Sequence, residues 1–116
     1  MGKRKRLAFM ITLNIKPVSV NNIYTGRRFL TPAGKAYKKA LAYMIPKISV
    51  PDGKLYIRYR FYFSSAGSDT ANAEKALTDS IAEKLGFNDN RVYKIEMEKF
   101  VVPKGQEKIE FEILPY

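Results

Sequence analysis

The stretch LYIRYRFYF, residues 55–63, determines the fold class of this 116-residue chain more clearly than any other segment. Its residues alternate between two faces, and a period of two predicts a β-strand with one face in the core. The expected buried face consists of Leu55, Ile57, Tyr59, Phe61 and Phe63. The opposite face carries Tyr56, Arg58, Arg60 and Tyr62. Arginine and tyrosine suit phosphate pairing and base stacking, and they suit the solvent side of a sheet equally well.

The segments before this strand predict one more strand and one helix. Alternating apolar residues predict a strand over residues 7–15, and residues 17–28 are expected to form a loop. Thr31 followed by Pro32 is typical of a helix start, and that helix should end before Pro46.

The segments after it complete an α+β pattern. Apolar residues at every fourth position predict a helix over residues 70–85, closed by Gly86. Strands are expected around residues 92–102 and 108–114. The order strand, helix, strand, helix, strand, strand predicts a single compact α+β domain over residues 1–116, with two helices on a mixed or antiparallel sheet.

The composition excludes several kinds of chemistry. The chain has no cysteine and no histidine, which excludes disulfides, thiolate zinc sites and triads that depend on imidazole. Hydrolysis would therefore depend on carboxylates with a hard cation. The longest apolar run is too short for a transmembrane helix, and the first residues lack the pattern of a secretory signal. The chain is therefore predicted to be cytoplasmic and not to associate with membranes.

The charge points to a polyanionic partner. Lysine and arginine number 21 against 11 acidic residues, which gives a net charge of +10. Such an excess favours a polyanionic partner through steering and counterion release, but charge alone does not choose between DNA, RNA and anionic lipid. A basic but ordinary surface would have the same composition.

Two carboxylates flank the helix expected at residues 70–85. Asp69 precedes this helix and Asp89 follows it. By pattern alone, Asp69 is a helix cap and Asp89 a turn residue. A return loop could bring the two side chains together if the strands flanking the helix are neighbours, but the sequence does not fix that packing.

Three stretches, in the correct order, resemble a known family. Residues 69–77, DTANAEKAL, resemble a D-x-D-N-x-x-K signature at the start of a helix. Residues 86–92, GFNDNRV, resemble a G-hydrophobic-x-D-D-x-x-V segment in which Asn88 replaces the first aspartate. Residues 19–24, SVNNIY, match an S-x-N-x-x-Y region. Together these stretches are similar to the RusA family of Holliday junction resolvases.

The resemblance implies a homodimeric, magnesium-dependent endonuclease that makes paired nicks in four-way DNA junctions. Asp69 and Asp89 would hold Mg²⁺, and Lys75 would lie beside the scissile phosphate. Ala71 stands where the family has a second aspartate, and a methyl group cannot bind a cation. The chain is therefore expected to be inactive, either as a natural relative or through a substitution that permits binding without cleavage. The retention of the surrounding motif favours the second explanation.

Contacts to the DNA backbone are expected from the loop near the amino end and from the central strand. The candidate residues are Asn21, Asn22, Tyr24, Arg27, Arg28, Arg58 and Arg60. The asparagines could equally satisfy turn geometry. The alternative functions are a non-catalytic DNA-binding module, whose acids are caps and turn residues, and a basic structural protein that binds RNA.

Overall fold

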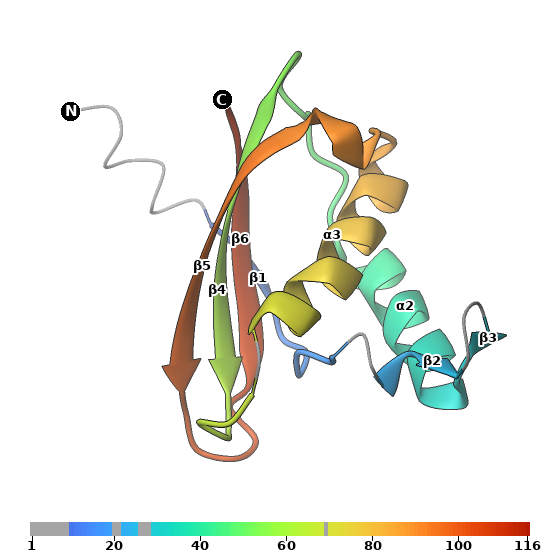
Figure 1. Ribbon diagram of the computed structural model, residues 1–116, viewed down its shortest axis with the longest axis vertical. Coiled ribbons are helices and arrows are strands. Elements are labelled where there is room, and N and C mark those ends of the chain that lie inside the picture. Colours follow the sequence, from blue (N-terminus) through green and yellow to red (C-terminus); the bar gives the residue numbers. More distant parts are fainter. Residues whose placement is uncertain (1–9, 20–21, 26–28, 69) are drawn as a thin grey trace.

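A mixed four-stranded sheet forms the centre of the structure, a computed structural model that describes residues 10–19, 22–25, 29–68 and 70–116 (Figure 1). The strand order is β1-β6-β4-β5. The strands are β1 (Ile11–Leu13), β4 (Leu55–Phe63), β5 (Val92–Val101) and β6 (Lys108–Pro115). Strand β6 runs antiparallel to its neighbours β1 and β4, whereas β5 runs parallel to β4. The prediction of an α+β fold with a mixed or antiparallel sheet is thus confirmed, in its mixed form.

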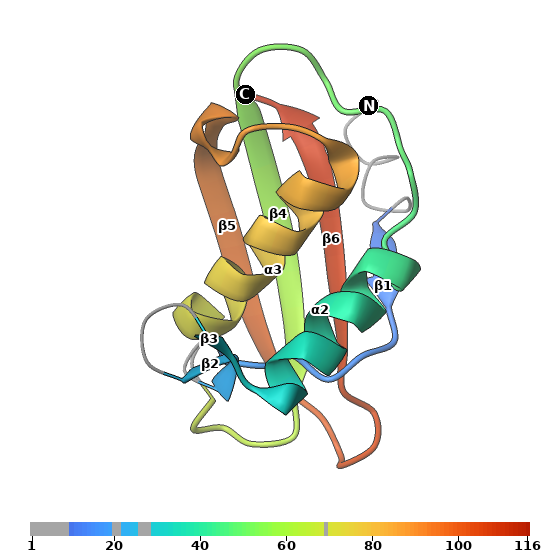
Figure 2. The same ribbon diagram turned by 90° about the vertical axis from the view of Figure 1, so that its right-hand side faces the viewer.

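Both long helices lie on the same face of the sheet (Figures 1 and 2). They are α2 (Pro32–Met44) and α3 (Thr70–Leu85). Helix α3 connects β4 to β5, and a connection of this length is what a parallel pair of neighbouring strands requires. No helix among the described residues is long and apolar enough to cross a bilayer.

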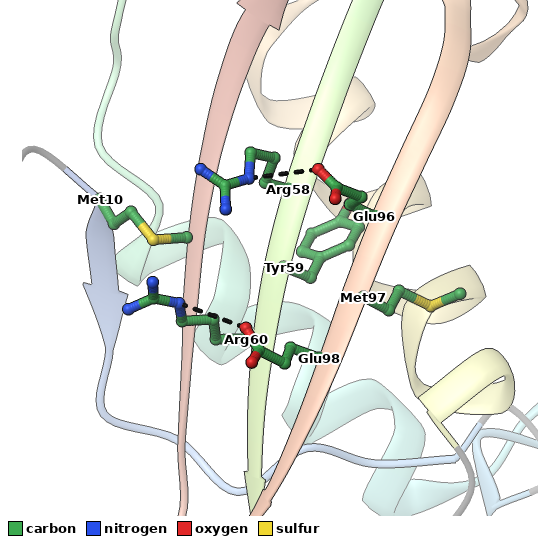
Figure 3. Close-up of a pocket in the computed structure, with 7 residues that line it drawn as sticks. All are labelled: Met10, Arg58, Tyr59, Arg60, Glu96, Met97 and Glu98. Atoms are coloured by element: carbon green, nitrogen blue, oxygen red, sulfur yellow. Dashed lines mark ion pairs between the residues drawn. The ribbon is translucent and has the colours of Figure 1, made fainter. Parts of the chain in front are cut away.

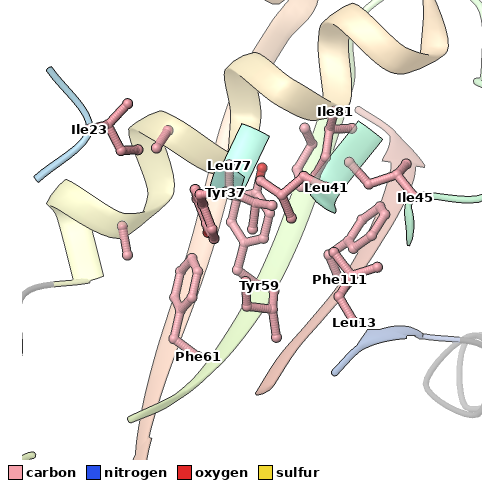
Figure 4. Packing of buried hydrophobic residues seen from close by; sticks show 14 of the residues in the cluster. Leu13, Ile23, Tyr37, Leu41, Ile45, Tyr59, Phe61, Leu77, Ile81 and Phe111 are labelled. Atoms are coloured by element: carbon pink, nitrogen blue, oxygen red, sulfur yellow. The ribbon is translucent and has the colours of Figure 1, made fainter. Parts of the chain in front are cut away.

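The core lies between the sheet and these two helices (Figure 4). The buried face of β4 is the one that the sequence predicts, since its odd-numbered residues are buried and its even-numbered residues are partly exposed. Fully buried partners come from the other elements: Leu13, Leu41, Leu77, Ile81, Ile109 and Phe111. Burial of a large apolar side chain stabilises a fold by roughly 1.5–3 kcal/mol. The alternation in residues 55–63 therefore places five apolar side chains of β4 in the core.

A short hairpin precedes α2 in a region where the sequence predicts mostly loop. Strands β2 (Tyr24–Thr25) and β3 (Phe29–Leu30) pair antiparallel as a separate two-stranded sheet. The prediction of a loop over residues 17–28 is wrong for this part. The physical reason is the length of each strand, since two residues are too few to show an alternating pattern.

The start of α2 is fixed to the segment before β2. Thr31 caps the helix, as predicted, because its hydroxyl oxygen accepts a hydrogen bond from the Gly34 N–H at 2.9 Å. The Thr31 N–H donates to the Ile23 carbonyl at 2.8 Å. The close approach leaves no space for a side chain at residue 34, where an added Cβ would overlap the Ile23 carbonyl oxygen and lie 2.9 Å from the Ile23 Cα. The hairpin region is thereby held against the first turn of α2.

Gly86 ends α3 as the sequence predicts, with a positive φ of 75°. Strand β1 is resolved as Ile11–Leu13, whereas the prediction covered residues 7–15, of which residues 7–9 lie outside the described part of the chain. The loop predicted after α3 contains a short 3-10 helix, η2 (Asp89–Arg91). These differences change element ends but leave the main elements as expected.

Burial of a tyrosine hydroxyl should make the stability of the fold sensitive to alkaline pH. Burial raises the pKa of Tyr37 to about 12. The folded-state pKa lies above the ordinary value of about 10, so the stabilising contribution is complete below pH 10 and is lost as pH rises through 12. We expect the free energy of unfolding to fall by roughly 2–3 kcal/mol over this window on account of Tyr37, since each pKa unit corresponds to about 1.4 kcal/mol.

Urea denaturation at a series of pH values between 8 and 11.5 measures this loss. Tyr37→Phe is the control, because it keeps the ring and removes the titrating hydroxyl. The variant should lose less stability per pH unit above pH 10 than the original chain. Equal slopes for the two proteins would show that Tyr37 ionises as easily in the folded state as in the unfolded state.

Candidate functional site

Four of the residues singled out in the sequence lie outside the described part of the chain. They are Asn21, Arg27, Arg28 and Asp69. Their expected roles stay predictions. The remaining candidates, and the immediate neighbours of Asp69, can be placed.

The amino-terminal turns of α3 carry the first group of motif residues. Ala71 and Lys75 are both exposed. The only acidic side chain in this half of the helix among the described residues is Glu74, which does not replace an aspartate at residue 71. Its carboxylate accepts a hydrogen bond from the Thr78 hydroxyl at 2.6 Å. That hydroxyl in turn lies 2.5 Å from the buried Tyr59 hydroxyl, which must donate because the Thr78 proton is committed to Glu74.

Asp89 lies in the second group, at the 3-10 helix η2. Asn88 caps this helix, since its side-chain oxygen accepts the Asn90 N–H at 2.9 Å. Arg91 fixes the other end, because its guanidinium donates to the Gly53 carbonyl at 2.9 Å and to the Pro51 carbonyl. The Asp89 carboxylate is exposed on this anchored segment. Asn88 therefore has a structural role at the position where the family signature has an aspartate.

The two groups lie at opposite ends of α3 (Figure 2). Thr70 begins the helix, and Asp89 follows its carboxyl end by four residues. A helix of 16 residues is about 24 Å long at 1.5 Å per residue. The strands flanking α3 are neighbours and run parallel, so β5 begins at the end of the sheet opposite to the end where α3 begins. Asp89, which precedes β5, is therefore separated from the start of the helix. The described residues of one chain include no group of three or more acids arranged to hold a metal ion. Asp89 is therefore not beside the described first turns of α3 in the same chain, and Mg²⁺ binding stays a prediction.

A small groove lies between α2, α3 and the hairpin of β2 and β3. It is lined by Ile23, Tyr24, Lys38, Ala76 and Asp79. Burial raises the pKa of the Asp79 carboxyl, and the neighbouring Lys38 opposes that rise. Sequence reasoning names Tyr24 as a candidate DNA contact but does not single out Lys38 or Asp79, because a lysine on a helix is typical of a solvated face. Asn22, which precedes the groove, is exposed.

The lysines of α2 form a basic surface. Lys35 and Lys39 are exposed, and Lys38 is partly exposed at the groove. The helix contains no acidic residue between Pro32 and Met44. Its positive charge is therefore not neutralised within its own element.

On the face of the sheet opposite the helices, here called the charged face, basic side chains are paired with acidic ones. Arg58 lies 3.4 Å from Glu96 and 3.0 Å from Glu112. Arg60 lies 3.9 Å from Glu98 and 3.8 Å from Glu110. Figure 3 shows the two arginines beside a hollow of about 290 Å³, with Glu96 and Glu98 on the neighbouring strand. Lys94 and Lys108 complete the set on this face, so four basic residues stand against four acidic ones.

This balance bears on the expected DNA contacts of Arg58 and Arg60. Both guanidinium groups are directed at carboxylates, and Glu112 is only 6% exposed. A buried carboxylate needs its partner, because an unpaired buried charge destabilises a fold by about 3–5 kcal/mol. The geometry thus favours the structural interpretation of these arginines, and their contact with DNA stays a prediction.

No family model and no curated protein matches this chain.

Proposed function

We propose that this protein binds branched DNA through its helix side and is a junction endonuclease of the RusA type that Ala71 renders inactive. The reaction is inferred from the three motif stretches, and the partner from the charge distribution. The observation that carries the proposal is a contrast: acids balance the basic residues of the charged face, whereas α2 carries three lysines and no acid of its own, with Asp79 of α3 beside Lys38. Polyanion binding follows unbalanced positive charge.

The positions of the motif residues also support this proposal. Tyr24, Lys75 and Asp89 belong to β2, α3 and η2. These elements lie on the side of the sheet that carries the helices (Figures 1 and 2). Lys75 is exposed and Asp89 is exposed, as a phosphate contact and a cation ligand both require. A DNA strand that contacts the α2 lysines would therefore meet the motif residues on the same side of the molecule.

The second candidate is a DNA-binding module without catalysis. It is favoured by Ala71 and by the separation of Asp89 from the first turn of α3 along the helix. In this alternative, Asn88 and Asp89 only form the turn before β5. The Asn88 side chain already has this role, since it accepts the Asn90 N–H at the start of η2.

A gel-shift comparison of a four-way junction, linear duplex and structured RNA tests the choice of partner. The proposal requires tighter binding to the junction than to the duplex of equal length. Equal affinity for junction and duplex would favour the non-catalytic module, and tightest binding to RNA would contradict both DNA-based functions.

A pair of double variants tests which surface binds. Lys35→Gln with Lys39→Gln removes two charges from α2, and Lys104→Gln with Lys108→Gln removes two charges from the region of the β5–β6 turn. The α2 variant should weaken junction binding by roughly tenfold or more and lower the salt slope by about 2, because each phosphate contact contributes about 0.9 to it. The second variant should change binding much less. Equal losses would show that only total charge matters, against a specific helix-side surface.

A further inference from the structure

Two exposed tyrosines lie at the end of the sheet where β4 and β5 begin and β6 ends (Figure 1). Tyr93 is 60% exposed and Tyr116 is 64% exposed, although large aromatic side chains usually contribute to a core. Their ring centroids are 5.8 Å apart, and the ring planes are tilted by 35°. Tyr93 and Tyr116 thus form a pair of rings that faces solvent, here called the aromatic patch.

A β-bulge gives Tyr93 its outward position. Leu55 of β4 pairs with Val92 of β5. The next residue of β4, Tyr56, pairs with Lys94, so β5 has one extra residue at this point, and that residue is Tyr93. Bulges of this kind change the direction of a side chain and are common beside functional sites. The exposure of Tyr93 therefore follows from the backbone of the strand.

Positive charge surrounds the aromatic patch. The Lys54 ammonium group lies 4.9 Å from the centre of the Tyr93 ring. Among the described residues, neither Lys54 nor Arg91 forms an ion pair with a carboxylate. A hollow of about 380 Å³ lies beside the ring, and no acid is among the residues that line it, which are Gly53, Lys54, Asn90, Arg91 and Tyr93. This hollow is therefore basic and aromatic, whereas basic and acidic groups are paired on the charged face.

Hydrogen bonds between three segments hold these groups in place. The Arg91 guanidinium donates to the carbonyls of Gly53 and Pro51, which fixes the turn before β4 to η2. The Tyr116 N–H donates to the Lys54 carbonyl at 2.9 Å, which fixes the end of β6 to the same turn. The rings and the cations are thus arranged before a ligand binds, and less ordering has to occur on binding.

We infer that the aromatic patch is a stacking site for an unpaired nucleobase of single-stranded DNA, with Lys54 and Arg91 beside the flanking phosphates. Aromatic rings that stack on bases and cations that follow the backbone are together the basis of single-strand binding. Arg91 uses two of its five N–H donors on backbone carbonyls, so others remain for a phosphate oxygen. An aliphatic ligand would leave the cations unused, and a free phosphate would leave the rings unused.

The position of the patch connects it to the motif residue Asp89. Tyr93 follows Asp89 by four residues, and Asn90 of η2 lines the hollow. A base that stacks on Tyr93 would hold its strand next to η2. Removal of a base from its stack costs least where the base is already single-stranded, so the site would favour DNA with unpaired bases over an intact duplex. The inference rests on the proposed function for the choice of DNA as the partner.

A fluorescent oligonucleotide tests the stacking directly. The probe is an oligothymidine of about 12 nucleotides with one central 2-aminopurine, whose emission falls when the base stacks on an aromatic ring. The original chain should quench the probe. Tyr93→Leu should lose the quenching and weaken binding by about fivefold or more, the smallest effect expected for one lost base stack. Tyr93→Phe keeps the ring and should retain both properties.

Tyr43→Leu is the matched control, because Tyr43 is 89% exposed but belongs to α2. It should leave the quenching unchanged. Equal quenching by Tyr93→Leu and the original chain would overturn the inference. Tighter binding of an oligouridine RNA of the same length would overturn the assignment to DNA. A change in self-association on Tyr93→Leu, with unchanged affinity for the probe, would assign the patch to a contact between copies and also overturn it.

The junction gel shift separates this inference from the proposed function. If Tyr93→Leu loses the quenching while the original chain binds junction and duplex equally, the stacking site stands and the preference for branched DNA fails. If the original chain prefers the junction while Tyr93→Leu changes neither quenching nor affinity for the probe, the proposed function stands and the stacking site fails.

Discussion

On the proposed function, Ala71→Asp is expected to yield a protein that cleaves a synthetic four-way junction when Mg²⁺ is present. The variant should fold, because residue 71 is exposed in the first turn of α3 and that turn contains no acidic residue among those described. A negative charge near a helix amino terminus stabilises it by about 0.3–1 kcal/mol. Removal of outer partners of a metal site reduces activity by roughly 10–100-fold, so restoration of a direct ligand should raise the cleavage rate at least that much.

Junction cleavage on a denaturing gel, with and without Mg²⁺, measures this effect. Ala71→Asn is the matched control, since it has nearly the same shape as the aspartate substitution but no charge. Lys75→Met in the Ala71→Asp background should reduce cleavage without abolishing binding. If the Ala71→Asp protein fails to cleave across a range of Mg²⁺ concentrations and junction sequences, the non-catalytic module becomes the better description.

Gly34→Ala should strongly destabilise the fold, although alanine is the better helix former. By propensity alone the substitution in α2 would stabilise the protein by about 1 kcal/mol. The added Cβ would instead overlap the Ile23 carbonyl oxygen, which is backbone and already accepts the Thr31 N–H. Overpacking usually destabilises by about 1–3 kcal/mol, and we expect a net loss near the upper end of that range.

Thermal unfolding followed by circular dichroism should show a decrease in Tm of roughly 10 °C for Gly34→Ala. Gly67→Ala is the control, because its Cβ would lie 3.7 Å from the Ser65 hydroxyl, an ordinary contact. It should change the free energy of unfolding by less than about 0.5 kcal/mol. An unchanged Tm for Gly34→Ala would mean that the hairpin segment is not held against α2 as described.

The sequence was sufficient for those parts of the fold that repeat a pattern over several turns or residues. The alternation in residues 55–63 corresponds to a buried strand face in the structure. The spacing of four residues between Ala73, Leu77 and Ile81 corresponds to a buried helix face. The Thr31 cap was also predictable, because a cap depends on local geometry. The hairpin of β2 and β3 was not, since its strands are too short to carry a pattern.

The candidate site was less predictable because it depends on how elements are placed relative to one another. Local motifs identified Lys75 and Asp89 as candidates, but only the parallel pairing of β4 and β5 shows that Asp89 lies beyond the opposite end of α3. Likewise, the alternation of residues 55–63 left two interpretations of Arg58. The glutamates that pair with it come from β5 and β6, more than 35 residues away along the chain, and no local pattern connects them.

Because the charges of the charged face are paired, the net charge is distributed unevenly over the molecule. The three lysines of α2 lie on the opposite side without an acid in their own helix, so, on the proposed function, a polyanion would attract this side and turn the helices toward itself before contact. The orientational search that slows most macromolecular encounters is thereby shortened. Association should consequently be fast at low ionic strength and slow steeply as salt is added, while the rate of dissociation changes less.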